Sequence, residues 1–413
     1  MRVLCVGHCS YDIICPVEAY PIEDNKYRIE ERIDSGGGSA SNAAYLLGKW
    51  GVETYMAGVI GSDDFGNKIK KELESVQVKT DNIETIFDQP TAISFILVNK
   101  QNGSRTVFSP SSKSSGQARK YDYLMNPDII LIDGYEYTAS REALNRYPEA
   151  ITIMDADTSS PEVLELCKYV KYIVCSKNFA ETMSKTKADF KDPKSLVNMY
   201  QNLRNRFPNK EIIVTLSEHG ALYAVNDEIK IMPGLNRQVK DTTGAGDIFH
   251  GAFAYGMLNR FPIEKCVSYG NIAAGLSLDK IGVRNSMPSL NEVISVYNEK
   301  NAPTGGESAE QTMPNQPVTP DANNAAQVST EQPSSDAAPN NSTVHVNASS
   351  PIDATTAPVN NEPVVTEQQI NEHPSETPPM DLPQDTTDTQ PDGSSTSNNQ
   401  SDMAIPDNLP DFK

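Results

Sequence analysis

A run of small residues in the segment 241–253 leads directly into an apolar helical pattern and contains one carboxylate at the junction. Gly244, Ala245 and Gly246 leave room for the backbone N–H groups of a first helical turn to face a transferring phosphate. Asp247 follows at the same helix end, where it could accept a proton from an attacking hydroxyl. Phosphoryl transfer demands chiefly positioning and charge stabilisation, so an anion hole with one base would suffice. A glycine-rich turn that is capped by the aspartate and has no catalytic role explains the bare pattern equally well.

A second block of small residues, 36–44, precedes another helical pattern. Its glycines permit a substrate to approach the backbone closely, and Asn42 offers both a donor and an acceptor to hydroxyl groups. Taken alone, the block is explained more simply if Ser39 or Ser41 caps the helix that follows.

Further polar candidates follow expected strands or lie on expected helices. Asn178 and Glu181 come after a strand that ends near Cys175, and their spacing places them on one helical face. Any surface helix can carry an amide and a carboxylate at this spacing. The turn 215–220 lies at the end of another strand. Asn271 lies on an alanine-rich helix, where a polar residue with internal partners is an equally good explanation.

The segment 241–253 resembles the carboxyl-side signature of the PfkB or ribokinase-like carbohydrate kinases, and the block 36–51 resembles their amino-side signature. The resemblance covers about residues 1–298, with both signatures in the expected order. It implies that Asp247 is the catalytic base and that the three small residues before it, Gly244, Ala245 and Gly246, form the anion hole. It also implies a substrate-binding wall that consists of Asp12, Gly37, Gly38, Ser39, Asn42, Glu136 and Asp247.

The same resemblance assigns positions to ATP and to metal ions. Asn178 and Glu181 match an N-x-x-E element that orders Mg²⁺, largely through water, and Ser217 replaces the usual first glycine of a nucleotide-contacting turn T-x-G-x-x-G. The implied ATP contacts are Asn178, Thr215, Ser217, Gly220, Gly246 and Asn271. The positions that hold a monovalent cation in several relatives, mostly through carbonyl oxygens, match Asp241, Thr243, Ser277, Lys280, Gly282 and Ser286. Such oxygen ligands suit a hard cation, so K⁺ activation is an expectation.

The elements that must position these residues alternate between strands and helices. Short apolar runs, typical of strands buried on both faces, are separated by helical patterns. This β-α-β alternation predicts an α/β fold, a ribokinase-like three-layer α/β/α arrangement with a central, mostly parallel sheet. Two stretches, about 13–33 and 92–108, predict a small second sheet, and the latter contains the hairpin dipeptide Asn102-Gly103. Such a sheet would be a lid that excludes water from the site. The runs expected to be strands are 3–6, 129–132, 151–154, 172–174 and 212–216.

Composition divides the chain of 413 residues into a kinase domain at 1–300 and an acidic segment at 301–413. The latter is rich in Pro, Ser, Thr, Asn and Gln and lacks apolar periodicity, which predicts disorder. It carries most of the net charge of −20, because 17 acidic residues face a single lysine after residue 300. The first 300 residues are therefore nearly balanced in charge, which argues against nucleic-acid binding.

The six cysteines lie in apolar segments without metal-ligand spacing, so we expect reduced, buried thiols. No apolar run approaches the length of a membrane span, and the first residues resemble a strand rather than a signal peptide. The sequence therefore predicts a cytoplasmic protein that does not bind membranes. Since lid sheets in the resembled family often pair, a homodimer through the lid is a further expectation.

The predicted function is ATP-dependent phosphorylation of a hydroxyl on a small sugar by in-line transfer. Strand ends near Glu136 and 155–157 resemble those of ketohexose-kinase-type members, so a fructose-like or a ribose-like substrate remains open. Few basic residues occur in the expected substrate wall, which disfavours a phosphorylated substrate, with Lys26, Arg28 and Arg105 as exceptions.

Two alternatives also remain open. A nucleoside kinase of the same fold would stack a base on the lid aromatics Tyr27, Phe95 or Phe108. A non-catalytic nucleotide-binding or sugar-binding regulatory protein would keep the fold without turnover. The presence of Asp247, Asn178 and Glu181 argues against that last alternative.

Overall fold

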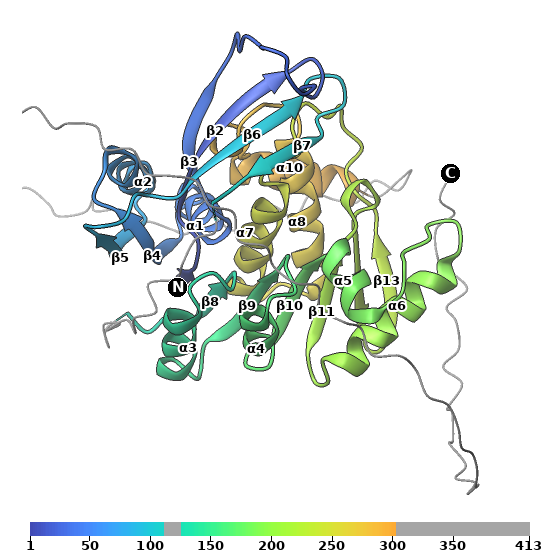
Figure 1. Ribbon diagram of the computed structural model, residues 1–413. Helices are drawn as coiled ribbons and strands as arrows, with labels where there is room; N and C mark the ends of the chain where they lie inside the picture. Colours follow the sequence, from blue (N-terminus) through green and yellow to red (C-terminus); the bar gives the residue numbers. More distant parts are fainter. Residues whose placement is uncertain (111–124, 303–413) are drawn as a thin grey trace, which may run out of the picture. The chain divides into compact units, whose positions relative to one another are not determined.

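The central element of the structure is a nine-stranded sheet (Figure 1). The structure, a computed structural model, describes residues 1–110 and 125–302, so the acidic segment expected at 301–413 lies outside the described residues apart from its first two. All neighbouring strands of the sheet are parallel except for the two pairs that β12 makes, which confirms the expected mostly parallel sheet. In spatial order the strands are β13 (Glu228–Met232), β12 (Ala221–Val225), β11 (Glu211–Thr215), β10 (Tyr172–Ser176), β9 (Ile151–Ala156), β8 (Ile129–Ile132), β1 (Arg2–Val6), β4 (Glu53–Gly61) and β5 (Lys79–Ile86).

The central strands are buried on both faces, as their continuous apolar sequences require. Successive side chains point to opposite faces of a strand. In β8, Ile130 and Ile132 therefore pack with one helical layer, whereas Ile129 and Leu131 pack with the other. The first layer consists of α3 (Tyr137–Arg146), α4 (Pro161–Leu166), α5 (Lys177–Ser184) and α6 (Pro193–Arg206). The second consists of α1 (Ser39–Lys49), α2 (Asp64–Ser75), α7 (Ala245–Leu258), α8 (Ile263–Ser277), the short α9 (Val283–Ser286) and α10 (Leu290–Lys300).

The expected second sheet has four strands in the order β3 (Ile33–Gly37), β2 (Ser10–Val17), β6 (Ile93–Asn99) and β7 (Arg105–Phe108). Asn102 and Gly103 lie in the turn between β6 and β7, where Gly103 has a φ of 68° and donates its N–H to the Asn99 carbonyl. The first lid segment extends beyond its expected bounds of about 13–33, because β2 begins at Ser10 and β3 ends at Gly37. Between these strands, residues 18–32 are exposed and form turns and coil, and Pro21 lies in this interruption.

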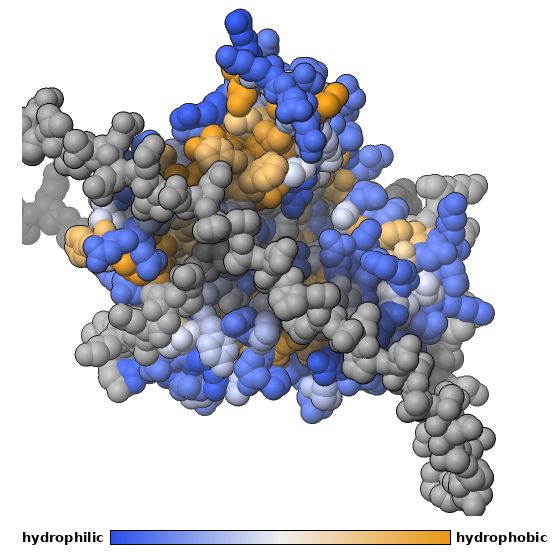
Figure 2. Space-filling model, in the orientation of Figure 1, coloured by the Kyte–Doolittle hydropathy of each residue, from blue (hydrophilic) through white to orange (hydrophobic). Residues whose placement is uncertain are grey.

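The two faces of the lid sheet have different neighbours. Ile14, Ile96 and Val98 form a small buried cluster on one face, which Ile281 also contacts. The other face includes Phe95 and Phe108, which are register partners in β6 and β7 and are both more than half exposed. In Figure 2 an apolar area lies on the lid among otherwise hydrophilic surface residues.

The expectation of reduced, buried thiols can be compared directly with the structure. All six cysteines are buried, and none of them forms a disulfide bond, as expected. Asp63 caps α2 by accepting a hydrogen bond from the Gly66 N–H. Within the described ranges, none of the helices has the length and apolar character needed to cross a lipid bilayer.

Candidate active site

The segments predicted to form the site meet at the amino ends of α1 and α7, next to the lid strand β2. The Asn42 side chain on α1 donates a hydrogen bond of 2.8 Å to Asp247 on α7, although the two residues are 205 positions apart. The carboxyl group of Asp12 on β2 lies close enough to Asp247 for mutual repulsion to raise the pKa of Asp12. The fold therefore brings both predicted signatures and one lid strand to a single place (Figure 1).

The glycine-rich turn that begins α7 has the geometry of an anion hole. Gly244 has a φ of 72°, and a Cβ at this position would lie 2.3 Å from a Val283 methyl carbon, so only glycine fits. No side chain of the described residues caps this helix end, and the first N–H groups of an α-helix have no intrahelical acceptor. A Cβ added to Gly246 would meet no atom of the described part of the chain within 4 Å. The anion-hole role of Gly244, Ala245 and Gly246 stays a prediction that this geometry suits.

Asn42 holds the predicted base and keeps one polar atom available. Its Nδ2 group donates to Asp247, whereas its buried Oδ1 atom has no hydrogen-bond partner among the described residues. A buried carbonyl oxygen without a partner is costly, and a ligand hydroxyl is a suitable donor for it. The Asn42 amide can therefore bind the base and a substrate hydroxyl at the same time.

Burial raises the pKa of Asp247 above that of an exposed aspartate, and neighbouring groups moderate the shift. The hydrogen bond from Asn42 and the positive charges of His250 and Arg105 act in the opposite direction. Arg105, on the lid strand β7, donates from Nη1 to the Thr242 hydroxyl at 2.9 Å, so the lid contacts the anion-hole turn directly. A carboxylate with a raised pKa in a partly enclosed site suits a general base.

A close-packed group of residues forms the predicted substrate wall beside this base. Asp12 accepts a hydrogen bond of 3.0 Å from Ser10, and burial raises its pKa to about 6. A Cβ on Gly37 would lie 2.1 Å from the Asp12 carboxyl group, and one on Gly38, whose φ is 93°, would lie 2.3 Å from the His8 carbonyl oxygen. These glycines are therefore needed for the packing of the wall itself.

The alternative in which a serine caps α1 is wrong, because the helix has no side-chain cap from Ser39 or Ser41. Instead, Asp133 at the end of β8 accepts hydrogen bonds from the N–H groups of Ala40, His8 and Tyr135. Ser41 accepts a hydrogen bond from Arg284. Asp133 thus fixes the start of α1, a role that sequence analysis missed because its partners lie on separate elements.

Two aromatic rings lie near the wall and were not foreseen. His8 and Tyr135 follow neighbouring strands, and their rings stack with centroids 4.3 Å apart. Burial lowers the pKa of His8 to about 4, so this ring is neutral at neutral pH. Glu136, the next predicted wall residue, is buried and directly precedes α3. The stacked pair offers a flat surface of the kind that sugar rings and bases both contact.

The predicted nucleotide-binding turn follows β11. Ser217 has a φ of 55°, in the left-handed region that explains why glycine is usual at this position of the turn. At Gly220, a Cβ would lie 2.0 Å from the Met232 carbonyl oxygen, so glycine is required. The Thr215 hydroxyl donates to the Cys175 carbonyl at 3.3 Å. Asn271 donates to the Met232 carbonyl at 3.0 Å, so the alternative that gave it internal partners gains support over a direct contact with adenine.

The residues predicted to order Mg²⁺ lie on α5, directly after β10. Asn178 is in the first turn of this helix, and Glu181 is one turn further. The Glu181 carboxylate already accepts a hydrogen bond from the Ala188 N–H and pairs with Lys187 at 2.6 Å. A contact to Mg²⁺ through water would leave these partners in place, whereas a direct bond would displace them. No group of three or more His, Cys, Asp or Glu side chains within the described ranges is arranged to hold a metal ion.

The predicted K⁺ loop is closed by its own hydrogen bonds. The Asp241 carboxylate accepts from the N–H and hydroxyl of Thr243 and from the Gly282 N–H. Ser277 and Ser286 donate their hydroxyls to carbonyls within their own helical turns, and Lys280 is exposed. Because these side chains are engaged, a monovalent cation would be held by main-chain carbonyl oxygens, which are suitable hard ligands.

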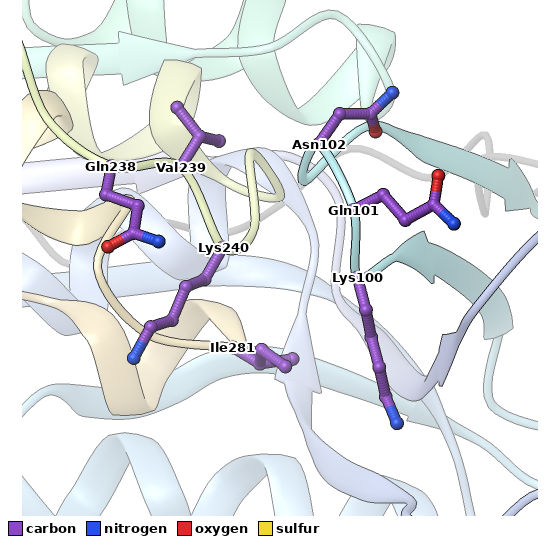
Figure 3. A pocket seen from close by; sticks show the side chains of 7 residues that line it. All are labelled: Lys100, Gln101, Asn102, Gln238, Val239, Lys240 and Ile281. Atoms are coloured by element: carbon purple, nitrogen blue, oxygen red, sulfur yellow. The ribbon is translucent and has the colours of Figure 1, made fainter.

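A separate hollow of about 480 Å³ lies beside the lid hairpin (Figure 3). It is lined by hairpin residues 100–102, by the segment 238–240 that leads to the anion-hole turn, and by Ile281. None of the predicted site residues contributes to its lining. We assign no ligand to it.

Comparisons with known proteins agree with this geometry. Residues 1–290 match the model of the pfkB family carbohydrate kinases. The chain is 23% identical over 300 residues to a ribokinase of Lactococcus lactis, a match that covers 71% of this chain and 95% of the relative. It is 22% identical over 306 residues to an ATP-dependent ribose-1-phosphate kinase of Halopiger xanaduensis, covering 73% and 99% of the two chains. The structure of Arabidopsis thaliana ribokinase in complex with ribose and ATP superposes with a TM-score of 0.62 at 21% identity, covering 71% and 97%.

The family match defines a phosphotransferase with an alcohol group as acceptor. The chain belongs to the pfkB family of carbohydrate kinases and has the ribokinase fold. Within that family it is an ATP-dependent sugar or nucleoside kinase. The Arabidopsis ribokinase structure is only 21% identical to this chain, so the substrate has to be argued from the site itself.

Proposed function

We propose that this protein transfers the γ-phosphoryl group of ATP to a hydroxyl of a small, uncharged sugar, with Asp247 as the base. The observation that carries the proposal is the Asn42–Asp247 pair, in which one amide group binds the carboxylate and presents an unpartnered acceptor. A substrate hydroxyl that donates to Asn42 Oδ1 lies next to the carboxylate that would receive the proton of the reacting hydroxyl. This arrangement supports a polyhydroxylated substrate.

The residues of this chain supply positioning and charge stabilisation in the proposed in-line transfer. Asp247 removes the proton as the substrate oxygen attacks, and the N–H groups of the turn 244–247 stabilise the charge on the phosphoryl oxygens. Asn178 and Glu181 would hold Mg²⁺ through water, and the ion would reduce the negative charge of the phosphate oxygens. Main-chain carbonyl oxygens of the loop around Asp241 would hold K⁺, which would add positive charge near the turn.

Acidic groups around the base favour an uncharged substrate over a phosphorylated one. Asp12, Asp133 and Asp155 are all buried near Asp247. Burial raises their pKa values to about 6 for Asp12 and Asp133 and about 7 for Asp155. An additional phosphate on the substrate would be repelled by this group of carboxylates, since like charges destabilise one another in a low-dielectric site. Ketohexoses and ribose-like pentoses remain the candidate substrates.

Two of the lid aromatics that were expected to stack a nucleobase do not face the predicted site. Ser94 lies on the same lid face as Asp12 and helps to hydrogen-bond it. Phe95, one residue further along β6, therefore points to the opposite face, and its register partner Phe108 points the same way. A nucleobase bound beside Asp247 would have to stack elsewhere, for example on Tyr135. The exposed Phe95 and Phe108 instead suit the expected homodimer through the lid.

The test is a panel of acceptors with ADP release as the readout. Pentoses, hexoses, ketoses, sugar phosphates and nucleosides are compared in the presence of Mg²⁺, each with and without K⁺. The proposal expects turnover with an uncharged sugar and little with sugar phosphates. Turnover with nucleosides alone would establish the nucleoside-kinase alternative. Nucleotide binding without phosphorylation of any acceptor would establish the regulatory alternative. Six buried cysteines that form no disulfide bond support a reducing compartment such as the cytoplasm.

A further inference from the structure

A buried histidine lies directly beneath the anion-hole turn. His250, one turn after Asp247 on α7, has a side chain that is only 4% exposed. Its Nδ1 atom lies 2.6 Å from the Gly246 carbonyl oxygen. Its Nε2 atom lies 3.1 Å from the Val174 carbonyl oxygen and 3.3 Å from a carboxylate oxygen of Asp155. Both ring nitrogens are therefore surrounded by oxygen atoms of β9, β10 and α7.

This set of neighbours determines the protonation of the ring. A neutral imidazole has one N–H donor and one lone pair, whereas the doubly protonated ring donates from both nitrogens. The carbonyls of Gly246 and Val174 can only accept, so a neutral ring would place its lone pair against one of them in a buried site. A proton on Asp155 would not remove that conflict, because the Val174 carbonyl is nearer to Nε2 than the carboxylate is.

The charges around the ring agree with this assignment. Burial alone would lower the pKa of His250, but Asp155, the two carbonyls and Asp247 outweigh it and raise the pKa above the ordinary value. Asp157 and Asp133 lie close enough to Asp155 to raise its pKa, and they add to the negative potential there. The imidazolium and the Asp155 carboxylate form a buried ion pair, which burial tolerates when both partners are hydrogen-bonded.

The Gly246 carbonyl connects this ring to the anion hole. A peptide unit is planar and trans, so the Gly246 C=O and the Asp247 N–H point in opposite directions from the same plane. A charged donor on the carbonyl fixes the orientation of that plane and strengthens the N–H as a donor, because linked hydrogen bonds polarise one another.

We propose that His250 is a positioning residue of the phosphoryl transfer: a buried imidazolium, anchored by Asp155 and the Val174 carbonyl, that aims the Asp247 N–H at the terminal phosphate. Its charge also lies close enough to stabilise the ionised form of the base. The inference rests on the proposed function of the α7 turn. Its direct test, the protonation state of the ring, does not depend on any substrate.

That test is NMR spectroscopy of the full-length protein labelled with ¹⁵N-histidine. The chain has five histidines, and the signal that disappears in His250→Asn identifies the ring, with His250→Gln as the substitute if the first variant does not fold. At pH values just above the ordinary histidine pKa of about 6.5, both ring nitrogens should still carry protons. In Asp155→Asn, which keeps the shape of the side chain and removes its charge, the ring should lose one proton near neutral pH. A wild-type ring with one unprotonated nitrogen at neutral pH would overturn the proposal, even in a fully active kinase.

The kinetic test separates positioning from mere structural support. His250→Asn keeps a neutral donor at the δ position and His250→Gln keeps one at the ε position, so each retains part of the hydrogen bonding without the charge. We expect kcat to fall by roughly 10- to 100-fold, less than the loss of a whole anion-hole donor, with the KM of the sugar unchanged. The acid limb of kcat/KM should move to higher pH, since the lost positive charge had lowered the pKa of Asp247.

The outcomes distinguish the alternatives. A fall in kcat together with a shifted acid limb supports the proposal. Thermal destabilisation with an unshifted acid limb and a proportional loss of active enzyme would show that His250 only supports the fold, and would refute it. Wild-type protein that phosphorylates no acceptor but retains the doubly protonated ring would disprove the proposed function while leaving the protonation of His250 established.

Discussion

The substitution Asp247→Asn addresses the proposed base with the least change in shape. The amide can still accept the hydrogen bond that Asn42 Nδ2 donates at 2.8 Å, so the local packing should persist. General-base catalysis contributes about 10²- to 10⁴-fold to the rate, equivalent to about 3–5 kcal/mol of the barrier. We therefore expect kcat to fall within that range. The affinity for ATP should be unchanged or slightly tighter, because the anion hole consists of backbone N–H groups and the variant removes a nearby negative charge.

The stability of this variant gives an independent control. Since burial raises the pKa of Asp247, the folded state binds a proton more tightly than the unfolded chain does. The ionised carboxylate therefore opposes folding at neutral pH, and a neutral amide should leave the urea midpoint unchanged or higher. The assays are steady-state ADP release, calorimetric titration with ATP, and urea unfolding. A variant that keeps more than about a tenth of wild-type kcat would refute the assignment of the base.

Three further predictions follow from named contacts. Asn42→Ala removes both the hydrogen bond to Asp247 and the unpartnered Oδ1 atom. The value of kcat/KM for the sugar should therefore fall by about 10- to 1,000-fold, whereas the affinity for ATP should persist. Equal losses of affinity for both substrates in titration calorimetry would contradict the role of Asn42 as a substrate contact. Ser217→Gly removes the strain of a side chain at a positive φ, so the free energy of unfolding in urea should rise by up to about 1 kcal/mol. A clear fall in that free energy would show that the Ser217 hydroxyl makes a needed contact. Because burial raises the pKa of Asp12, its contribution to stability falls as pH rises from about 4 through about 6. Asp12→Asn should therefore flatten the pH dependence of the urea midpoint in that window. An unchanged slope would contradict the effect of burial on Asp12.

The parts of the fold that sequence predicted best are those with an unambiguous local pattern. The run 129–132 is a strand with the expected bounds, because four consecutive apolar residues suit only a site buried on both faces. The bounds of the first lid segment were less accurate, because β2 begins at Ser10, before the expected start near residue 13, and β3 ends at Gly37, beyond residue 33. Asn102-Gly103 located its hairpin turn correctly, since Gly103 adopts a positive φ there.

The site was predictable only as far as its motifs extend. The motifs placed Asn42 and Asp247 near one another, but the donor–acceptor arrangement of their side chains depends on how α1 packs against α7. The cap of α1 by Asp133 and the contact of His250 with Asp155 join residues from different strands and helices. No local spacing encodes such contacts. They become visible only when the order of the parallel strands brings their carboxyl ends together.

A crystal structure with a non-hydrolysable ATP analogue and the preferred acceptor tests the central claim most directly. Our account predicts the terminal phosphate on the N–H groups of the turn 244–247, with a carboxylate oxygen of Asp247 within about 2.6–3.2 Å of the acceptor hydroxyl. It also predicts a second substrate hydroxyl on Asn42 Oδ1. A terminal phosphate bound away from this turn, or an acceptor hydroxyl beyond the reach of Asp247, would contradict it.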